Sequence, residues 1–189
     1  MISLRAARPA DAPAIGAVHV AAWRNTYPGI LPDDYLARLS AARQAAHYDG
    51  AIRGPGGVFV AVASGTDVPL GSPPRVVGFT TAGRGRGGMI VGRRLGEGEV
   101  ETLYVLDDWR ERGIGRRLLR AAAGHLAETG CRSLYLWVLC DNPARWFYQR
   151  LGGTQAAVAP IKVAGQSVMQ TAFVWDPIQR LLAASPQAS

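Results

Sequence analysis

The sequence predicts a mixed α/β fold in which helices flank a sheet with both antiparallel and parallel strands. Apolar, β-branched runs of strand length alternate with segments of helical periodicity. The order strand–helix–strand across residues 99–139 needs a crossover connection, and such a connection joins parallel strands. Other neighbouring strands, on either side of the turns at 64–74 and 164–165, are predicted to form antiparallel hairpins. The sheet is therefore expected to be mainly antiparallel, with one parallel pair.

The amino-terminal quarter predicts one strand and two helices. Residues 2–8 have the composition of a strand. A helix follows, with Asp11 as its expected N-cap. Pro28-Gly29 ends this helix, and a second one begins at 32–34 and runs, with a break, to about His47.

The next part of the chain alternates strands with glycine-rich turns. The runs 58–63 and 75–82 are apolar and are predicted to be strands, joined by the Gly- and Pro-rich segment 64–74. Residues 83–88 contain the pattern G-x-G-x-x-G, but no helix of useful length follows, so we interpret them as a basic loop and not as a dinucleotide fingerprint. We hypothesise that the arginines of this loop face an anionic ligand.

The most informative stretch lies between residues 100 and 126. Residues 100–106 read as a strand, and helical spacing begins at Ile114. The turn between them holds two glycines and three arginines: Gly113, Gly115, Arg110, Arg112 and Arg116. Glycines let backbone N–H groups approach a ligand, and a helix N-terminus offers unpaired donors and a partial positive charge. The turn is therefore expected to bind phosphate, although the Gly-Lys-Ser/Thr of a Walker loop is missing.

The carboxyl-terminal part adds strands and one short helix. We expect a strand at 134–139, a helix at 142–150, and a closing hairpin from 154–159 and 167–175. Residues 1–176 are expected to form one domain, and 177–189, rich in Ala, Gln, Ser and Pro, a loosely ordered tail.

Composition excludes several classes of protein. The net charge is +7, from 21 basic and 14 acidic residues, but Lys162 is the only lysine and the arginines are mostly dispersed. Nucleic-acid binding, which favours clustered basic residues interleaved with exposed aromatics, is not expected. No apolar run is long enough for a membrane span and no signal peptide is recognised, so a cytoplasmic location without membrane contact is expected. The two cysteines and three histidines have no metal-ligand spacing, so no metal is expected.

Two motifs in the right order resemble one known family. The pattern Arg110-x-x-Gly113-x-Gly115 resembles the pyrophosphate loop of the GCN5-related N-acetyltransferases, the GNAT superfamily. The segment 142–153 resembles that family's later motif, in which an Asn begins a short helix, an aromatic–Tyr pair follows and a Gly ends it. The resemblance spans roughly 2–175, and its specific part is 99–153. It implies the GNAT fold, in which the two crossover strands splay apart and the pantetheine of acetyl-CoA enters the gap.

The resemblance further implies an N-acetyltransferase that moves the acetyl group of acetyl-CoA directly to a primary amine. The acceptor, a small molecule or a protein N-terminus or lysine, stays open, as do the acyl-chain preference and a homodimer formed by the closing strands. A non-catalytic acyl-CoA-binding or sensing module is the alternative function. In this family the basic turn holds the pyrophosphate and backbone groups of the strand pair with pantetheine. The expected cofactor-binding residues are Leu103, Tyr104, Val105, Arg110, Glu111, Arg112, Gly113, Ile114, Gly115, Arg116, Asn142 and Tyr148.

Acyl transfer to an amine needs a base and benefits from an acid. Glu97, Glu99 and Glu101 lie two residues apart, so their side chains would share one face of a strand. The resemblance favours Glu99 as the base, six residues before Val105, with Glu101 second; simple solvated carboxylates are the alternative. For the acid the resemblance favours Tyr148, whose hydroxyl would face the CoA sulfur; a core aromatic is the alternative.

The acceptor is expected to lie against aromatic side chains. Trp23, Tyr27 and Tyr35 are on the amino-terminal helices, which form one wall of the acceptor cleft in the family that this chain resembles. An aromatic wall suits an ammonium group. We expect Trp23 and Tyr27 to contact the acceptor, and core packing is the alternative for each.

Overall fold

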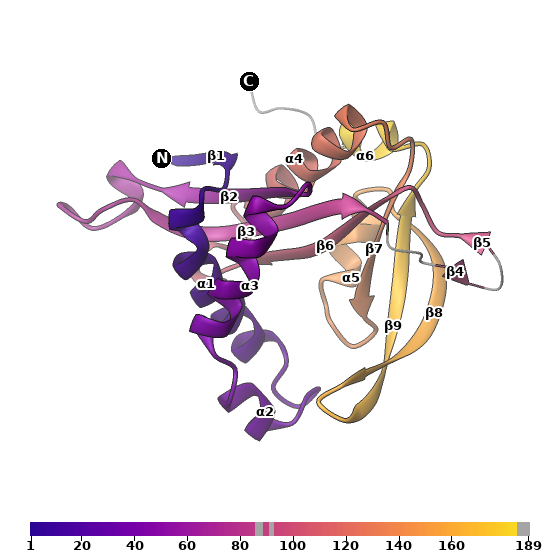
Figure 1. Ribbon diagram of the computed structural model, residues 1–189, viewed down its shortest axis with the longest axis horizontal. Coiled ribbons are helices and arrows are strands. Elements are labelled where there is room, and N and C mark those ends of the chain that lie inside the picture. Colours follow the sequence, from indigo (N-terminus) through magenta and orange to yellow (C-terminus); the bar gives the residue numbers. More distant parts are fainter. Residues whose placement is uncertain (86–88, 91–92, 185–189) are drawn as a thin grey trace.

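The computed structural model describes residues 1–85, 89–90 and 93–184. Seven strands form one sheet in the order β1-β2-β3-β6-β7-β9-β8 (Figure 1). They are β1 (Ile2–Ala6), β2 (Gly57–Ala63), β3 (Arg75–Arg84), β6 (Gly98–Val105), β7 (Leu134–Leu139), β8 (Thr154–Val163) and β9 (Gln166–Trp175). A separate two-stranded ribbon pairs β4 (Met89–Ile90) with β5 (Arg93–Arg94). In the large sheet only β6 and β7 run parallel, so the predicted fold class is confirmed.

Helices cover both faces of the sheet. They are α1 (Ala12–Thr26), α2 (Asp33–Ala37), α3 (Ala41–Arg53), α4 (Ile114–Glu128), α5 (Arg145–Arg150) and α6 (Gln179–Ala184). Ile15 of α1 and Tyr48 of α3 pack with Val60 and Phe79 on one face of the sheet. The other face carries α4, α5 and α6, whose apolar residues share a cluster with β7 and β9. No helix in the described parts of the chain is long and apolar enough to cross a membrane.

The parallel pair is short. β6 and β7 are matched only at Gly98–Leu134 and Glu99–Tyr135. Beyond Glu99 the two strands diverge, and each keeps its outer neighbour, β3 or β9. The expected splay of the crossover strands is therefore present, and it opens toward the carboxyl end of β6.

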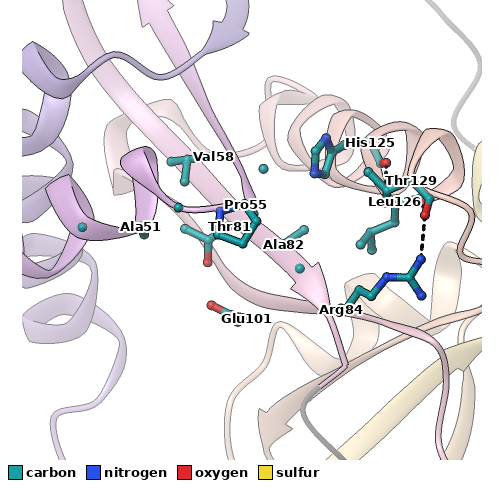
Figure 2. Close-up of a pocket in the computed structure, with 15 residues that line it drawn as sticks. Ala51, Pro55, Val58, Thr81, Ala82, Arg84, Glu101, His125, Leu126 and Thr129 are labelled. Atoms are coloured by element: carbon teal, nitrogen blue, oxygen red, sulfur yellow. Dashed lines mark hydrogen bonds between the residues drawn. The ribbon is translucent and has the colours of Figure 1, made fainter.

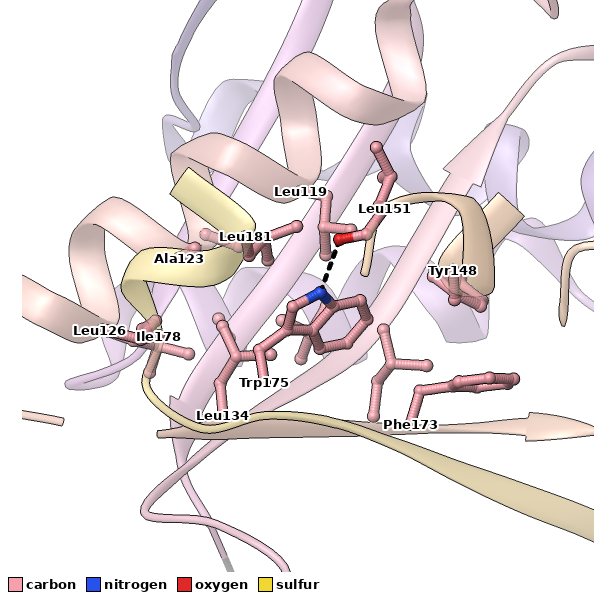
Figure 3. Packing of buried hydrophobic residues seen from close by; sticks show 14 of the residues in the cluster. Leu119, Ala123, Leu126, Leu134, Tyr148, Leu151, Phe173, Trp175, Ile178 and Leu181 are labelled. Carbon is pink, nitrogen blue, oxygen red and sulfur yellow. Dashed lines mark hydrogen bonds between the residues drawn. The ribbon is translucent and has the colours of Figure 1, made fainter. Parts of the chain in front are cut away.

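The expected loose tail is wrong for residues 177–184. Ile178 and Leu181 are fully buried, in the same cluster as Trp175 (Figure 3). Arg120 of α4 donates a hydrogen bond to the Leu182 carbonyl. The polar composition of 177–189 gave no sign of these two core positions. Residues 185–189 lie outside the described chain. We propose that the single domain extends through α6.

Smaller differences have local causes. The Asp11 side chain does not cap α1, because its carboxylate accepts two hydrogen bonds from Arg5 at 2.7 and 2.9 Å and one from the Arg8 N–H at 2.7 Å. These bonds, that with Arg5 first, lower the pKa of Asp11. The second predicted helix is two helices, α2 and α3, since the chain turns at Arg38–Ser40. Of the predicted basic loop at 83–88, the first two residues extend β3, and 86–88 lie outside the described residues.

Candidate active site

The opening between β6 and β7 exposes one edge of β6. The Leu106 N–H donates to the Val77 carbonyl at 2.9 Å, on the β3 side. Alternate residues of a strand direct their backbone groups to the same neighbour. The N–H and C=O groups of Leu103 and Val105 therefore face away from β3, toward the space that β7 has left.

The basic turn joins β6 to α4 through unusual backbone conformations. Glu111 and Gly113 have positive φ angles of 61° and 72°. The Arg117 N–H is bonded to the Gly113 carbonyl at 3.1 Å, so Ile114, Gly115 and Arg116 occupy the first turn of α4. N–H groups of a first turn have no intrahelical partner and attract anions. The turn thus offers a group of backbone donors beside the opening.

The arginines of the turn differ in their surroundings. Arg110 is paired with Asp107 at 2.9 Å and donates to the Thr26 hydroxyl of α1 at 3.0 Å, so it links the turn to α1. The Arg112 guanidinium lies 4.8 Å from the centroid of the buried Trp109 ring. Arg116 and Glu111 are exposed.

Tyr148 lies on α5. It is 7% exposed and packs against Phe147, Phe173 and Trp175. Burial raises the pKa of its phenol well above the ordinary value, so the hydroxyl keeps its proton. Among the described residues this hydroxyl has no hydrogen-bond partner.

Asn142 connects the segment before α5 to α1. Its Oδ1 accepts a hydrogen bond from the Ala144 N–H at 2.9 Å, and its Nδ2 donates to the Tyr27 hydroxyl at 3.1 Å. The side chain therefore fixes the turn that leads into α5 and joins it to a helix 115 residues away in sequence.

The three glutamates do not share one strand face as expected. Glu97 precedes β6 and accepts hydrogen bonds from the backbone and guanidinium of Arg132, which lower its pKa. Glu99 accepts a hydrogen bond from the Tyr135 hydroxyl at 2.8 Å. The register between β3 and β6 skips Glu101, which is the extra residue of a β-bulge. The bulge interrupts the alternation on which the expectation depended.

Glu101 lines a cavity of about 580 Å³ that sequence reasoning missed (Figure 2). The cavity lies between the end of α3, the end of β3 and the carboxyl-terminal part of α4. Thr81 and His125 contribute to its walls, as does Arg84, which donates to the Thr129 carbonyl at 3.0 Å. Residues far apart in sequence line this cavity, so no local sequence pattern could predict it.

Three aromatic side chains at the end of α1 and on α2 lie together, and we refer to them as the aromatic wall. The Trp23 ring centroid lies 4.9 Å from that of Tyr27 and 6.4 Å from that of Tyr35. Val163 and Val168 at the tip of the β8–β9 hairpin pack against the same cluster, and Figure 1 shows this tip beside α2. The wall is therefore in contact with the tip of the β8–β9 hairpin.

His19 is a further member of this wall that the sequence did not single out. Its Nδ1 lies 2.7 Å from the Tyr48 hydroxyl, and its ring stacks on Trp23 at a centroid distance of 5.2 Å. Burial, with a smaller effect of His47, lowers the pKa of His19 to about 4, so the imidazole is neutral at pH 7. The spacing of four residues to Trp23 on one helix was the available signal.

Comparisons with known proteins agree with this geometry. A family described as "Acetyltransferase (GNAT) family" matches residues 20–153. The uncharacterized N-acetyltransferase YuaI of Bacillus subtilis is 31% identical over 182 residues, which is 96% of each chain. The probable N-acetyltransferase Rv2775 of Mycobacterium tuberculosis is 27% identical over 79% of this chain and 78% of its own.

Solved structures share the fold. YncA of Salmonella typhimurium, a putative acetyltransferase solved with acetyl-CoA, superposes with a TM-score of 0.64 at 20% identity, over 93% of each chain. The sequence match over most of the chain, together with the opened strand pair and the basic turn, leads to one conclusion. The chain belongs to the GNAT acetyltransferase family.

Proposed function

We propose that this protein transfers the acetyl group of acetyl-CoA directly to a primary amine of a small molecule or peptide. The observation that carries the proposal is the opened strand pair, whose free β6 edge leads to a basic turn and a helix N-terminus. The relatives named N-acetyltransferases and the similar structure solved with acetyl-CoA support it.

The residues around the opening fit such a donor. The unpaired backbone groups of Leu103 and Val105 suit the amides of an extended pantetheine arm, as a neighbouring strand would. The first turn of α4 and the exposed Arg116 suit a diphosphate. We propose that Arg112 adds charge from the turn, and that Arg110 does so while it keeps the turn in place against α1.

Acetyl-CoA supplies a thioester. The protein must take one proton from the amine and give one proton to the thiolate that leaves. An alkyl amine has a pKa near 10, so it reaches the thioester in reactive form only after losing a proton. We assign this proton first to Glu99, which is partly buried and oriented by Tyr135, and second to Glu101. Tyr148, protonated and with a hydroxyl that no described residue binds, gives its proton to the departing thiolate. In this reaction the amine nitrogen first bonds to the thioester carbon. Collapse of the tetrahedral adduct then breaks the carbon–sulfur bond as the sulfur takes the Tyr148 proton, without an acyl-enzyme.

Calorimetric titration with acetyl-CoA tests the donor half of this proposal. A Cβ built on Gly115 lies 3.6 Å from the Phe147 ring, an ordinary contact, so Gly115→Ala is compatible with the folded chain. The same Cβ stands at the helix N-terminus where the diphosphate is proposed to bind. We expect Gly115→Ala to weaken acetyl-CoA binding about tenfold or more without lowering the melting temperature.

Gly124 provides the matched control on the same helix. A Cβ there meets no atom within 4 Å, so Gly124→Ala should leave binding unchanged. Dephospho-CoA and NADH serve as ligand controls. Absence of acetyl-CoA binding to the unaltered protein, or equal binding by Gly115→Ala, would refute the donor site. Thiol release in the presence of an amine panel then tests transfer.

A further inference from the structure

Trp23 carries a buried N–H group without a partner. Its Nε1 is shielded from solvent, and the described residues offer it no hydrogen bond. A buried donor in this state costs about 1–3 kcal/mol, so such groups call for an explanation. An unfilled ligand position is one such explanation.

The surroundings of this N–H place it at the opening. The His19 ring stacks on Trp23 and also lies 5.1 Å from the Tyr104 ring, centroid to centroid. Burial raises the pKa of the Tyr104 phenol, and the nearby Trp23 N–H opposes this rise in part, although the two groups lack hydrogen-bond geometry. Tyr104 belongs to the part of β6 that β7 has left, and the hydroxyls of Tyr27 and Tyr148 are its electrostatic neighbours. The indole N–H therefore lies where the α1 wall meets the proposed reaction centre.

The groups around Trp23 are uncharged donors. Burial raises the pKa of Tyr27, Tyr104 and Tyr148, so all three hydroxyls keep their protons. The Tyr27 oxygen already accepts from Asn142, which leaves its own O–H to donate. No carboxylate appears among the causes of these three shifts. A cluster of hydrogen-bond donors suits a ligand oxygen that accepts hydrogen bonds better than it suits a bare ammonium group.

Resting on the proposed function, we propose that Trp23 Nε1–H and the Tyr104 hydroxyl bind an oxygen of the acetyl acceptor. The acceptor is then an amine that carries a carbonyl or carboxylate oxygen on the carbon next to its amino group: an amino acid, its amide or a peptide N-terminus. The acceptor, and not the thioester, is the source of this oxygen. Trp23 projects from α1, whereas the backbone N–H groups of Leu103 and Val105 already face the space proposed for the donor.

Two probes that differ by the carboxamide group next to the amine test the inference, and the decisive readout is the change in preference that a Trp23 substitution causes. L-Phenylalaninamide and 2-phenylethylamine share the aromatic ring and the amino group, and only the first has the carbonyl. A site built to hydrogen-bond a group discriminates strongly against the analogue that lacks it. We expect the unaltered protein to prefer the amide in kcat/KM, and Trp23→Phe to reduce this preference about tenfold, as loss of one buried hydrogen bond predicts.

Trp146→Phe is the matched control. Trp146 is 51% exposed, with its ring under the Arg145 guanidinium, and its loss should leave the preference unchanged. Equal loss of turnover for both amines in Trp23→Phe would mean that the indole contributes packing or contacts the thioester, and would overturn the inference. An unchanged preference would do the same.

A second measurement uses the unaltered protein and needs no turnover. With ¹⁵N-labelled tryptophan the chain gives five indole N–H signals, and the Trp23 signal is the one missing from Trp23→Phe. In the presence of CoA, L-phenylalaninamide should move the Trp23 signal downfield and slow its exchange with water, and 2-phenylethylamine should not. No selective change would refute the inference. Failure of the protein to acetylate either amine would instead count against the proposed function.

Discussion

Two tryptophans distinguish two regions of this molecule: the core around Trp175 and the aromatic wall around Trp23. Trp175 is fully buried among Leu134, Ile178 and Leu181, and its Nε1 donates to the Leu151 carbonyl at 2.8 Å (Figure 3). Trp23 is surrounded by aromatic rings, and its N–H has no partner in the described chain. The Trp175 N–H is hydrogen-bonded within the core, whereas the described residues supply no acceptor for the Trp23 N–H.

The largest effect on the free energy of unfolding should come from a substitution in the core around Trp175. Trp175→Ala removes a fully buried ring and leaves the Leu151 carbonyl unpaired, so we expect a loss of about 4 kcal/mol in the free energy of unfolding. Trp23→Ala should cost less than half as much, because that ring is partly exposed and its N–H has no bond to lose. Urea unfolding of both variants measures the difference. Equal losses would contradict the contrast between the two regions.

The next effect is the loss of folding stability at acidic pH that His19 of the aromatic wall causes. His19 has its pKa lowered from 6.5 to about 4, so the unfolded chain binds more protons than the folded chain between these values. The contribution to stability is full above pH 6.5 and is lost as the pH falls toward 4, by about 3 kcal/mol at pH 4.

His19→Asn removes this titration, and its unfolding free energy should fall less steeply between pH 6.5 and 4 than that of the unaltered protein. The carboxylates, Asp11 among them, titrate in both proteins and cancel in the comparison. Parallel curves would show that His19 is already charged or exposed in the folded state.

A third effect concerns Tyr148 and changes kcat but not stability. Tyr148 touches both regions: its ring packs on Trp175 and Phe173, and its hydroxyl has no partner among the described residues. Tyr148→Phe keeps the ring, so we expect little change in stability and a fall in kcat of about a hundredfold, with acetyl-CoA affinity retained. Stopped-assay turnover and calorimetry together measure this, and undiminished kcat would end the role of Tyr148 as acid.

The proposed base is assessed in the same assay. Glu99→Gln should flatten the acidic limb of the pH–rate profile, because the group that takes the amine proton no longer titrates. Glu101→Gln, two residues along β6, is the control. If Glu101→Gln flattens the limb and Glu99→Gln does not, the two assignments must be exchanged.

Local backbone chemistry made the conformation of the basic turn predictable. The turn at Arg110–Gly115 and the segment at Asn142–Gly153 are continuous in sequence, and a positive φ at Gly113 is a property of that residue and its neighbours. The order of strands and helices followed from periodicity, and the parallel pair followed from the crossover. The roles of Glu99, Tyr148 and the other site residues stay predictions.

What could not be predicted depends on contacts between distant segments. The bulge at Glu101 is defined only by its register against β3. The environment of Trp23 depends on Tyr104, which is distant from it in sequence. The burial of Ile178 and Leu181 depends on their packing against residues of α4, β7 and β9. Such features follow from tertiary packing, which overrides the composition of a short segment.

The short pairing of β6 with β7 has a thermodynamic consequence. Two matched pairs of residues join the four-stranded part of the sheet to the three-stranded part. On the proposed function, acetyl-CoA fills the gap beyond them and supplies to β6 the hydrogen bonds that β7 does not. The donor then acts as a missing strand of the folded state as well as a reactant, and its binding energy adds to the stability of the sheet in proportion to the logarithm of its concentration.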